Sequence, residues 1–347
     1  MAASIASTKA TPTEFGSSSS DRAEAQRGFD IIGDVHGCAS LLTDLLERLG
    51  YSAEGTGTYR HPERQAIFVG DLVDRGEEHV EVLETVKRMV DSGSAQIVMG
   101  NHEFNAITYA IEHPERPGKY LRPHTDKNKN QHQAFLEQVS DEARADYLKW
   151  FATMPLWLDL GGVRVVHACW HERSMRIVED VLGSNRFSTT AHFVRASDKA
   201  DRLYAAVEVL LKGPEIDIAG HGQQPYVDKD GHERSEARVA WWREGATTLR
   251  DLAVMDGNFT TPTGEPYPEL PAVEVEHAER SFSYDGGVPV LYGHYWRSGQ
   301  PTEGLDYTRH TACVDFRAIK SGNLVAYRWN GEKEIQPDHY FTVDSKV

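Results

Sequence analysis

Short apolar runs alternate with helical patterns over the first third of the chain. The runs are Phe29–Ile32, Ala66–Val69 and Gln96–Met99, and each has the length and composition of a buried strand. After a polar turn, each run is followed by a segment whose apolar residues recur at helical spacing. These segments are Ala39–Leu49, His79–Val90 and Phe104–Ile111. Because strand, turn and helix recur three times, the pattern predicts parallel strands joined by helical crossovers.

The rest of the sequence indicates a less regular middle segment, followed by further strands near the C-terminus. Residues Lys119–Gln133 are polar and basic, so we expect a surface loop there. Two short apolar runs around Gly161 and Gly162 predict a hairpin. The segment Arg195–Glu279 holds a helix at Asp201–Leu211 but few clear strands, and we expect an insertion that covers the functional site. Further strands are predicted at Val288–Tyr292, Thr311–Phe316 and Asn323–Trp329.

These patterns predict one α/β domain over residues 28–347, with a cap inserted at about 195–279. The first 27 residues are rich in Ala, Ser and Thr and lack the apolar stretch of a secretory signal, which predicts a disordered tail. A transit peptide is the alternative for this tail. It is disfavoured because no arginine precedes Arg22 and because Glu14 interrupts the segment.

Composition narrows the class of protein. The 347 residues are 39% hydrophobic and 26% charged, as in ordinary globular proteins, with a formal charge of −16. The acidic balance disfavours nucleic acid as a partner, although bound cations would still allow a phosphorylated substrate. The three cysteines, Cys38, Cys169 and Cys313, have no paired spacing, which favours a cytoplasmic protein. No apolar run approaches the roughly 20 residues that span a bilayer, so no membrane partner is expected.

Residues whose side chains bind metal ions follow the predicted strands. They are Asp34, His36, Asp71, Asn101, His167 and His294. Asp34 and His36 alternate with Val35, so both can face one ion. Asp71 has two carboxylate oxygens and can bridge that ion to a second ion. The amide oxygen of Asn101 and the imidazoles of His167 and His294 would complete the second site.

This ligand set mixes oxygen and nitrogen without a thiolate. It predicts two divalent ions, most simply Mn²⁺, with Fe, Zn or Ni as alternatives. A water between two such ions loses a proton near neutral pH and becomes a nucleophile. Three neighbouring residues complete the expected chemistry. Arg75 can bind a phosphoryl group bidentately, His102 can protonate the leaving oxygen, and Asp74 can orient that imidazole. We expect Arg75, Asn101 and His102 to contact the substrate.

Three of the sequence blocks carry a family resemblance. Gly33-Asp34-Val35-His36-Gly37, Gly70-Asp71-Leu72-Val73-Asp74-Arg75-Gly76 and Gly100-Asn101-His102-Glu103 resemble the signature blocks of the phosphoprotein-phosphatase branch of calcineurin-like metallophosphoesterases. The Gly293-His294 pattern and the final strands are more similar to the bacterial members, which include diadenosine tetraphosphate hydrolases and the phosphatase module of polynucleotide kinase-phosphatases. The resemblance implies a dinuclear metal site on a β-sandwich flanked by helices in αββα layers, with the residue roles given above.

Some positions leave alternatives open. The family usually has small residues after the first late histidine, whereas Trp170 lies close to His167 here. His221, between two glycines, is the chief rival of His294 as a ligand. The family's further phosphate-binding arginine has no clear counterpart, and Arg238 and Arg243 are the candidates. The aromatic residues Trp170, Tyr295, Trp296, Trp241 and Trp242 would either line a pocket or pack in the core.

The expected function is hydrolysis of a phosphomonoester through a metal-bound hydroxide. The substrate would be a phosphorylated Ser/Thr protein or a small phosphorylated metabolite. A hydrolase of dinucleoside polyphosphates or nucleotides is the first alternative. A noncatalytic metal-binding scaffold is the second, and it is disfavoured because Asp74, Arg75 and His102 are all present.

Overall fold

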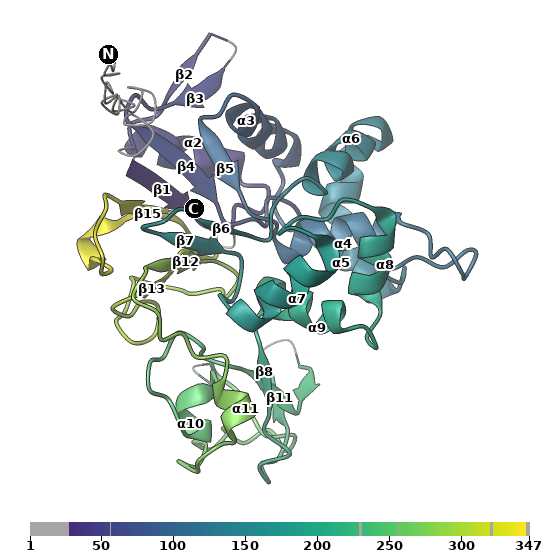
Figure 1. Cartoon of the computed structure of the whole chain (residues 1–347), viewed down its shortest axis with the longest axis vertical. Coiled ribbons are helices and arrows are strands. Elements are labelled where there is room, and N and C mark those ends of the chain that lie inside the picture. The colour runs from purple at the N-terminus through teal and green to yellow at the C-terminus, as the bar shows by residue number, and fades with distance from the viewer. Residues whose placement is uncertain (1–27, 56, 229–230, 256, 320–321, 345–347) are drawn as a thin grey trace, which may run out of the picture.

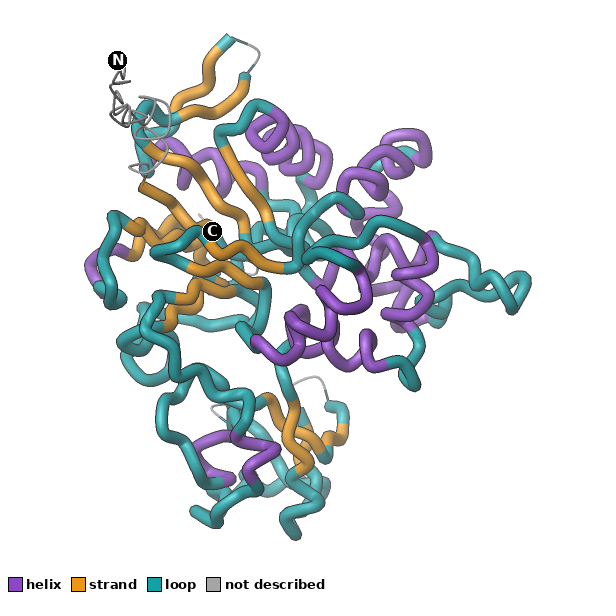
Figure 2. Tube along the Cα trace, viewed as in Figure 1, coloured by secondary structure: helices purple, strands orange, loops and turns teal. Residues whose placement is uncertain are grey.

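The computed structural model describes residues 28–344 apart from 56, 229–230, 256 and 320–321 (Figure 1). The tail expected over residues 1–27 lies outside the described residues. Two sheets form the centre of the protein, with helices grouped to one side of them (Figure 2). This arrangement confirms the predicted α/β class with two sheets and flanking helices.

The first sheet contains the three strands predicted from the N-terminal third. Its strands are β1 (Gly28–Ile32), β4 (Arg64–Phe68), β5 (Ala95–Ile97), β14 (Asp315–Phe316), β15 (Asn323–Trp329) and β16 (Tyr340–Asp344). Its order is β14-β15-β1-β4-β5, and β16 pairs with β15. Strand β4 pairs in parallel with both β1 and β5, which confirms the predicted parallel strands. The motif residues that follow β1, β4 and β5 therefore leave the sheet at one edge.

The second sheet supplies the later candidate ligands. Its strands are β6 (Trp157–Asp159), β7 (Arg164–Val166), β12 (Val290–Tyr292) and β13 (Thr311–Cys313), in the order β13-β12-β7-β6. Strands β6 and β7 form the predicted antiparallel hairpin. The predicted strand Thr311–Phe316 is wrong as a single element: β13 ends at Cys313, and the chain enters the first sheet as β14 at Asp315. This crossing places Asp315 at the start of β14, directly after the chain leaves the second sheet.

Apolar residues on both faces of the strands explain why the two sheets pack together. One core contains residues from both sheets, including Ile31, Ile67, Val165, Leu291 and Tyr327. Their neighbours along the strands, such as Ile32, Phe68, Val166 and Tyr292, belong instead to the larger core. Because side chains alternate between the faces of a strand, both faces of each sheet are buried. This double burial accounts for the nearly continuous apolar runs in the sequence.

The helices of the main unit lie beside the two sheets (Figure 2). They are α2 (Ala39–Arg48), α3 (His79–Asp91), α4 (Asn101–Ala110), α5 (Asp126–Gln138), α6 (Asp141–Phe151), α7 (Glu172–Leu182), α8 (Thr190–Ser197) and α9 (Arg202–Lys212). Helices α2 and α3 contact the first sheet. The surface loop predicted at Lys119–Gln133 is wrong in its second half, because α5 begins at Asp126. The Thr125 hydroxyl caps this helix by accepting the Asn128 N–H at 3.2 Å.

A smaller unit extends below the second sheet (Figure 1). It has its own apolar core, which includes Ile216, Tyr226, Leu249, Leu270 and Val275. Its elements are β8 (Glu215–Asp217), β9 (Tyr226–Val227), β10 (Glu233–Arg234), β11 (Glu236–Arg238), α10 (Leu249–Leu252) and α11 (His277–Arg280). That this segment is an inserted cap stays a prediction. The remaining elements are the hairpin β2 (Ser52–Glu54) and β3 (Thr58–Arg60) and the 3₁₀ helix η1 (Pro337–His339). Within the described ranges, each helix is too short or too polar to cross a bilayer.

Candidate metal centre

Each candidate ligand lies just beyond a strand of one of the two sheets. Asp34 and His36 follow β1, Asp71 follows β4, Asn101 begins α4 after β5, His167 follows β7, and His294 follows β12. These strand ends meet where the two sheets pack against each other. Two groups of side chains there could each hold a metal ion: His36 with Asp71 and His102, and Asp71 with His167 and His294. In each group the ligand atoms lie within 4.8 Å of one another.

His36 presents an imidazole nitrogen that has no protein partner. Its Nδ1–H donates to the carbonyl oxygen of Val73 at 2.8 Å. Its Nε2 is buried, lacks a hydrogen-bond partner among the described residues, and lies 3.7 Å from Asp71 Oδ2. Burial, followed by the charge of Arg75, lowers the pKa of His36 to about 3. The neutral ring therefore directs a free lone pair toward Asp71, as a metal ligand does.

A similar arrangement surrounds His167. Its Nδ1–H donates to the carbonyl oxygen of Val69 at 2.7 Å, which leaves Nε2 as the ring nitrogen that could bind a metal. That Nε2 lies 3.0 Å from Asn101 Oδ1 and 3.5 Å from Asp71 Oδ2. Three atoms that offer lone pairs thus face one another in a buried place, which favours a cation between them.

Asp71 lies between the two groups. Its Oδ2 is 3.7 Å from the Nε2 of His36, 3.8 Å from that of His102 and 3.5 Å from that of His167. Its Oδ1 accepts the backbone N–H of His102 at 2.9 Å. Burial works to raise the pKa of Asp71, but its electrostatic interactions with the imidazoles of His167, His102 and His36 outweigh it and hold that pKa below its usual range. Asp71 is therefore placed so that its carboxylate could contact a cation held by either group.

The carboxylate of Asp34 is contacted by the backbone of His294 and not by its imidazole. The N–H of His294 donates to Asp34 Oδ2 at 3.2 Å, and His294 Nδ1 lies 2.8 Å from Asn101 Oδ1. A Cβ at Gly293 would lie 2.2 Å from Asp34 Oδ1, so this contact requires glycine. Neither of the two ligand groups includes Asp34. Burial, then the charges of Asp315 and Asp71, raise its pKa. A cation would relieve this repulsion between buried carboxylates, so the donor set fits bound divalent metal.

The expected pair of His102 and Asp74 has a further member, His132. The Nδ1–H of His102 donates to Asp74 Oδ2 at 2.5 Å, and the Nδ1–H of His132 donates to Asp74 Oδ1 at 2.8 Å. Burial opposes the charged form of His102, but the charge of Asp71 and the hydrogen bond to Asp74 outweigh it and raise the pKa of His102. His132 was missed from the sequence because its segment was interpreted as a loop.

Glu103 holds the turn that carries Asp71. Its buried carboxylate accepts the N–H of Asp71 and the N–H of Leu72, each at 2.8 Å, and the N–H of Gly100 at 3.1 Å. Burial and the charge of Asp71 raise the pKa of Glu103 to about 7. The block Gly100–Glu103 thus joins two strand ends through one side chain.

Replacing Glu103 with Gln is expected to lower the free energy of unfolding by about 1–3 kcal/mol, because an amide NH₂ would face a buried N–H and leave it without an acceptor. Denaturant unfolding measures this change. Glu77→Gln, which alters an exposed carboxylate, is the matched control and should stay within about 0.5 kcal/mol of wild type. An unchanged Glu103→Gln protein would show that these three hydrogen bonds add no net stability.

Arg75 lies at the mouth of the site against an indole. Its guanidinium carbon is 3.9 Å from the ring centroid of Trp296. Both residues line a cavity of about 630 Å³, together with Cys38, Leu41 and Ile319. The backbone N–H of Trp296 donates to Asp315, a buried carboxylate that the sequence analysis did not single out. Asp315 fell inside the strand predicted over Thr311–Phe316, so the sequence pattern gave no signal for it.

Backbone strain is concentrated at this site. Within the described part of the chain, the non-glycine residues with positive φ are His36, Asp71, Asp74, Arg75, His294, Trp296 and Arg317. Most side chains avoid this region, and such residues persist where surrounding contacts over-determine them. The first five are candidate site residues, Trp296 stacks against Arg75, and Arg317 in turn lies over the ring of Trp296. The strain marks Trp296 and Arg317 as parts of the same constellation.

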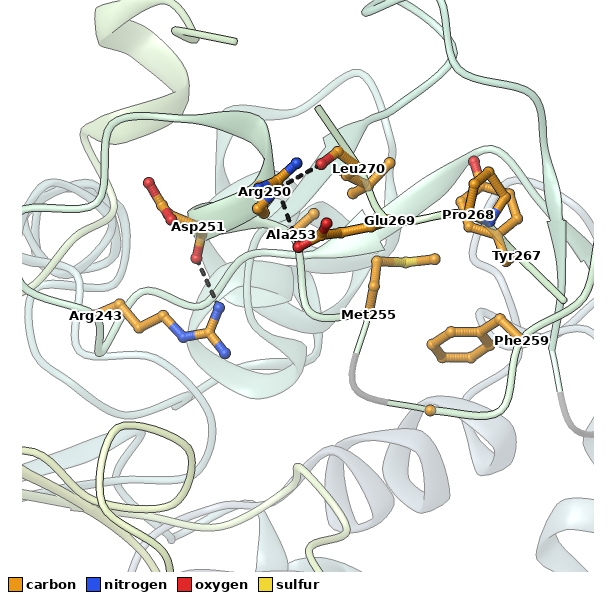
Figure 3. Close-up of a pocket in the computed structure, with 11 residues that line it drawn as sticks. Arg243, Arg250, Asp251, Ala253, Met255, Phe259, Tyr267, Pro268, Glu269 and Leu270 are labelled. Carbon is orange, nitrogen blue, oxygen red and sulfur yellow. Dashed lines mark hydrogen bonds and ion pairs between the residues drawn. The ribbon is translucent and has the colours of Figure 1, made fainter. Parts of the chain in front are cut away.

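Two of the residues that the sequence left open as alternatives, His221 and Arg243, lie in the smaller unit. His221 pairs with Glu279 at 2.8 Å in the smaller unit, away from the two ligand groups. Arg243 lines a cavity of about 480 Å³ there and donates to the carbonyl oxygen of Asp251 (Figure 3). Apart from Arg243, none of the residues that line this cavity is a candidate site residue.

Arg238 is the arginine that reaches the candidate site. After burial, its charge is the largest cause that lowers the pKa of His294. It also pairs with Glu215 at 3.1 Å. Trp241 and Trp242 are fully buried, with ring centroids 4.8 and 5.7 Å from that of Tyr292, so they pack in the core.

Comparisons with known proteins agree with this geometry. The profile of the calcineurin-like phosphoesterase family matches residues 29–294. The asymmetrical bis(5'-nucleosyl)-tetraphosphatase PrpE of Halalkalibacterium halodurans is 51% identical over 84 residues, which are 24% of this chain and 34% of that protein. The enzyme of the same name from Bacillus subtilis is 32% identical over 146 residues, 40% of this chain and 57% of that protein. The match thus spans about a third to just over half of these relatives.

A similar chain among the solved structures is a protein serine/threonine phosphatase from Saccharomyces cerevisiae. It is 13% identical, with a TM-score of 0.45 over 93% of this chain and 80% of that chain.

Proposed function

This chain belongs to the calcineurin-like phosphoesterase family, and from that membership we propose that it is a metal-dependent hydrolase of phosphate monoesters. Members of the family use divalent metals. The substrate would be a phosphorylated Ser/Thr protein or a small phosphorylated metabolite. The observation that carries the proposal is the convergence of imidazole, amide and carboxylate lone pairs around Asp71.

We assign the ligand roles to the residues expected from the sequence. His36 and Asp34 would hold one cation, Asp71 would contact both, and the second would be held by Asn101, His167 and His294. When bound, the two cations supply an acidified water as nucleophile and positive charge beside the phosphate oxygens. Mn²⁺ is the ion we propose, because the mixed oxygen and nitrogen donors contain no thiolate.

The chain's own side chains would do the remaining work. Arg75, exposed at the mouth of the site, would bind the phosphoryl oxygens with its planar fork. Asn101 and His102 would also contact the substrate. His102, whose raised pKa favours its protonated form, would give a proton to the leaving oxygen. Asp74 accepts the other imidazole proton and would keep the ring in that orientation.

Removal of divalent cations tests the proposal directly. We expect the purified protein to hydrolyse an aryl phosphate, to lose that activity after chelation and to regain it with Mn²⁺, because the nucleophile depends on the cations. Chelated protein returned to Mg²⁺ or Ca²⁺ alone is the control for ion identity. Activity that persists in full after chelation, with metal shown to be gone, would contradict a metal-dependent mechanism.

A second candidate function is hydrolysis of dinucleoside polyphosphates, favoured by the printed names of the relatives. Measuring kcat/KM side by side on a phosphopeptide, an aryl phosphate and diadenosine tetraphosphate would distinguish the two candidate functions. A higher kcat/KM on the dinucleotide would select the second candidate, and a higher value on the monoesters would select the first. The cytoplasmic location expected from the sparse cysteines stays a prediction.

A further inference from the structure

Helix α5 supports the turn that carries Asp74 and Arg75. His132, Phe135 and Gln138 are spaced three residues apart, so they share one face of the helix. The Nδ1–H of His132 donates to Asp74, and the Nε2–H of Gln138 donates to the carbonyl oxygen of Gly76 at 2.9 Å. Phe135 is fully buried between these two contacts. The buried face of this mostly polar helix thus bonds to the turn at both ends, while Phe135 packs against His79 and Phe151.

His132 is held as firmly as a core residue. Its side chain is 5% exposed, and its ring centroid lies 5.0 Å from that of Phe135 and 5.3 Å from that of Tyr109. These contacts fix the direction of its Nδ1–H toward Asp74 Oδ1, while His102 occupies Asp74 Oδ2. Asp74 is therefore bonded at both oxygens, each by a different imidazole.

The second hydrogen bond matters because a carboxylate turns easily. The torsion that rotates the aspartate carboxylate is broad, so one bond to one oxygen leaves the group free to swing. Bonds to opposite oxygens from two fixed rings remove that freedom. Asp74 also has φ of 69°, a strained conformation that its surroundings must hold.

We propose that His132 is a positioning residue for the proton transfer from His102, acting through Asp74. The inference rests on the proposed function. His132 does not touch the reacting groups; it keeps the Asp74 carboxylate where it aligns the His102 ring with the leaving oxygen. A positioned general acid helps most when the leaving group is basic. Loss of His132 should therefore slow esters of weakly acidic alcohols or phenols more than esters of strongly acidic phenols.

The test compares His132→Phe with wild type, both loaded with Mn²⁺. Phenylalanine keeps the buried ring but has no N–H donor. On phenyl phosphate we expect kcat to fall about 10- to 100-fold, the range found when a residue supporting a catalytic group is removed. On 2,4-dinitrophenyl phosphate, whose leaving group needs no proton, we expect at most about a threefold fall. KM and bound metal should stay near wild type, because His132 contacts neither substrate nor ligand.

Three further variants separate positioning from structural support. His132→Gln keeps an N–H donor and should recover most of the rate on phenyl phosphate. Phe135→Leu perturbs the same buried face without touching Asp74, and it should lower both rates by one common factor, if at all. In protein that already carries Asp74→Asn, adding His132→Phe should not change the ratio of the rates on the two esters any further, because His132 acts through Asp74.

Equal losses on both esters in His132→Phe, or additive losses in the double variant, would overturn the role of His132 while leaving the proposed function intact. Wild-type protein that hydrolyses neither ester with Mn²⁺ would overturn the proposed function and, with it, this inference. If His132→Phe does not fold, His132→Leu, which also lacks an N–H donor, replaces it in each of these comparisons. A rate on phenyl phosphate that Gln does not restore would count against the role.

Discussion

Asp71→Asn is expected to leave the purified protein with fewer than two bound cations and to lower kcat/KM by more than about 100-fold. The basis is the position of Asp71 Oδ2, within 3.8 Å of three imidazole nitrogens from both ligand groups. Losing this charge would affect both ions at once. The loss of activity should therefore exceed the roughly 10- to 100-fold loss that is typical when a residue only supports a metal ligand. Elemental analysis gives the metal content, and steady-state kinetics on an aryl phosphate give the rate.

Asp285→Asn is the matched control, because it makes the same chemical change at an exposed position away from the site. It should keep wild-type metal content and rate. Two tightly bound ions in Asp71→Asn would exclude a bridging role for this carboxylate.

His102→Ala is expected to lower kcat by at least about 100-fold while metal content stays near wild type. The reason is loss of the proton donor, since general acids contribute about 10²- to 10⁴-fold. His102 also lies within 4.8 Å of His36 and Asp71, close enough to be a ligand itself. The metal measurement therefore decides between the two roles of His102.

His102→Gln serves as the comparison, because it keeps polar bulk without an acidic proton. If both variants lose a cation, His102 acts as a ligand. If both retain the cations and only the rate falls, it acts as the acid. A wild-type rate in His102→Ala would remove this residue from the mechanism.

The parts predicted from the sequence are those where chemistry and local structure coincide. Strands β1, β4 and β5 are short apolar runs, and each ends in a ligand-type residue, so a single stretch of chain contains both signals. The C-terminal ends of these strands meet, which is why Asp34, Asp71 and Asn101 could be grouped without coordinates. Their assignment as ligands remains a prediction until metal is measured.

The parts that could not be predicted depend on contacts between distant segments. Helix α5 has few apolar residues because it packs along one narrow face, so its period is weak and His132 gave no signal. Asp315 lay inside an apparently continuous strand, and nothing in the alternation marks where the chain leaves one sheet for the other. Arg238 could be separated from Arg243 only once the fold of their segment was known.

The left-handed backbone at Asp74, Arg75, Trp296 and Arg317 has an evolutionary consequence. Glycine would adopt those dihedral angles without strain, so selection for folding alone pulls these positions toward glycine. The side-chain contacts of the site oppose that pull, among them the two imidazole hydrogen bonds to Asp74 and the stacking of Arg75 on Trp296. In a descendant that no longer needs catalytic activity, glycine would therefore accumulate early at these positions. Such a pseudoenzyme could then be recognised from its sequence before any assay was made.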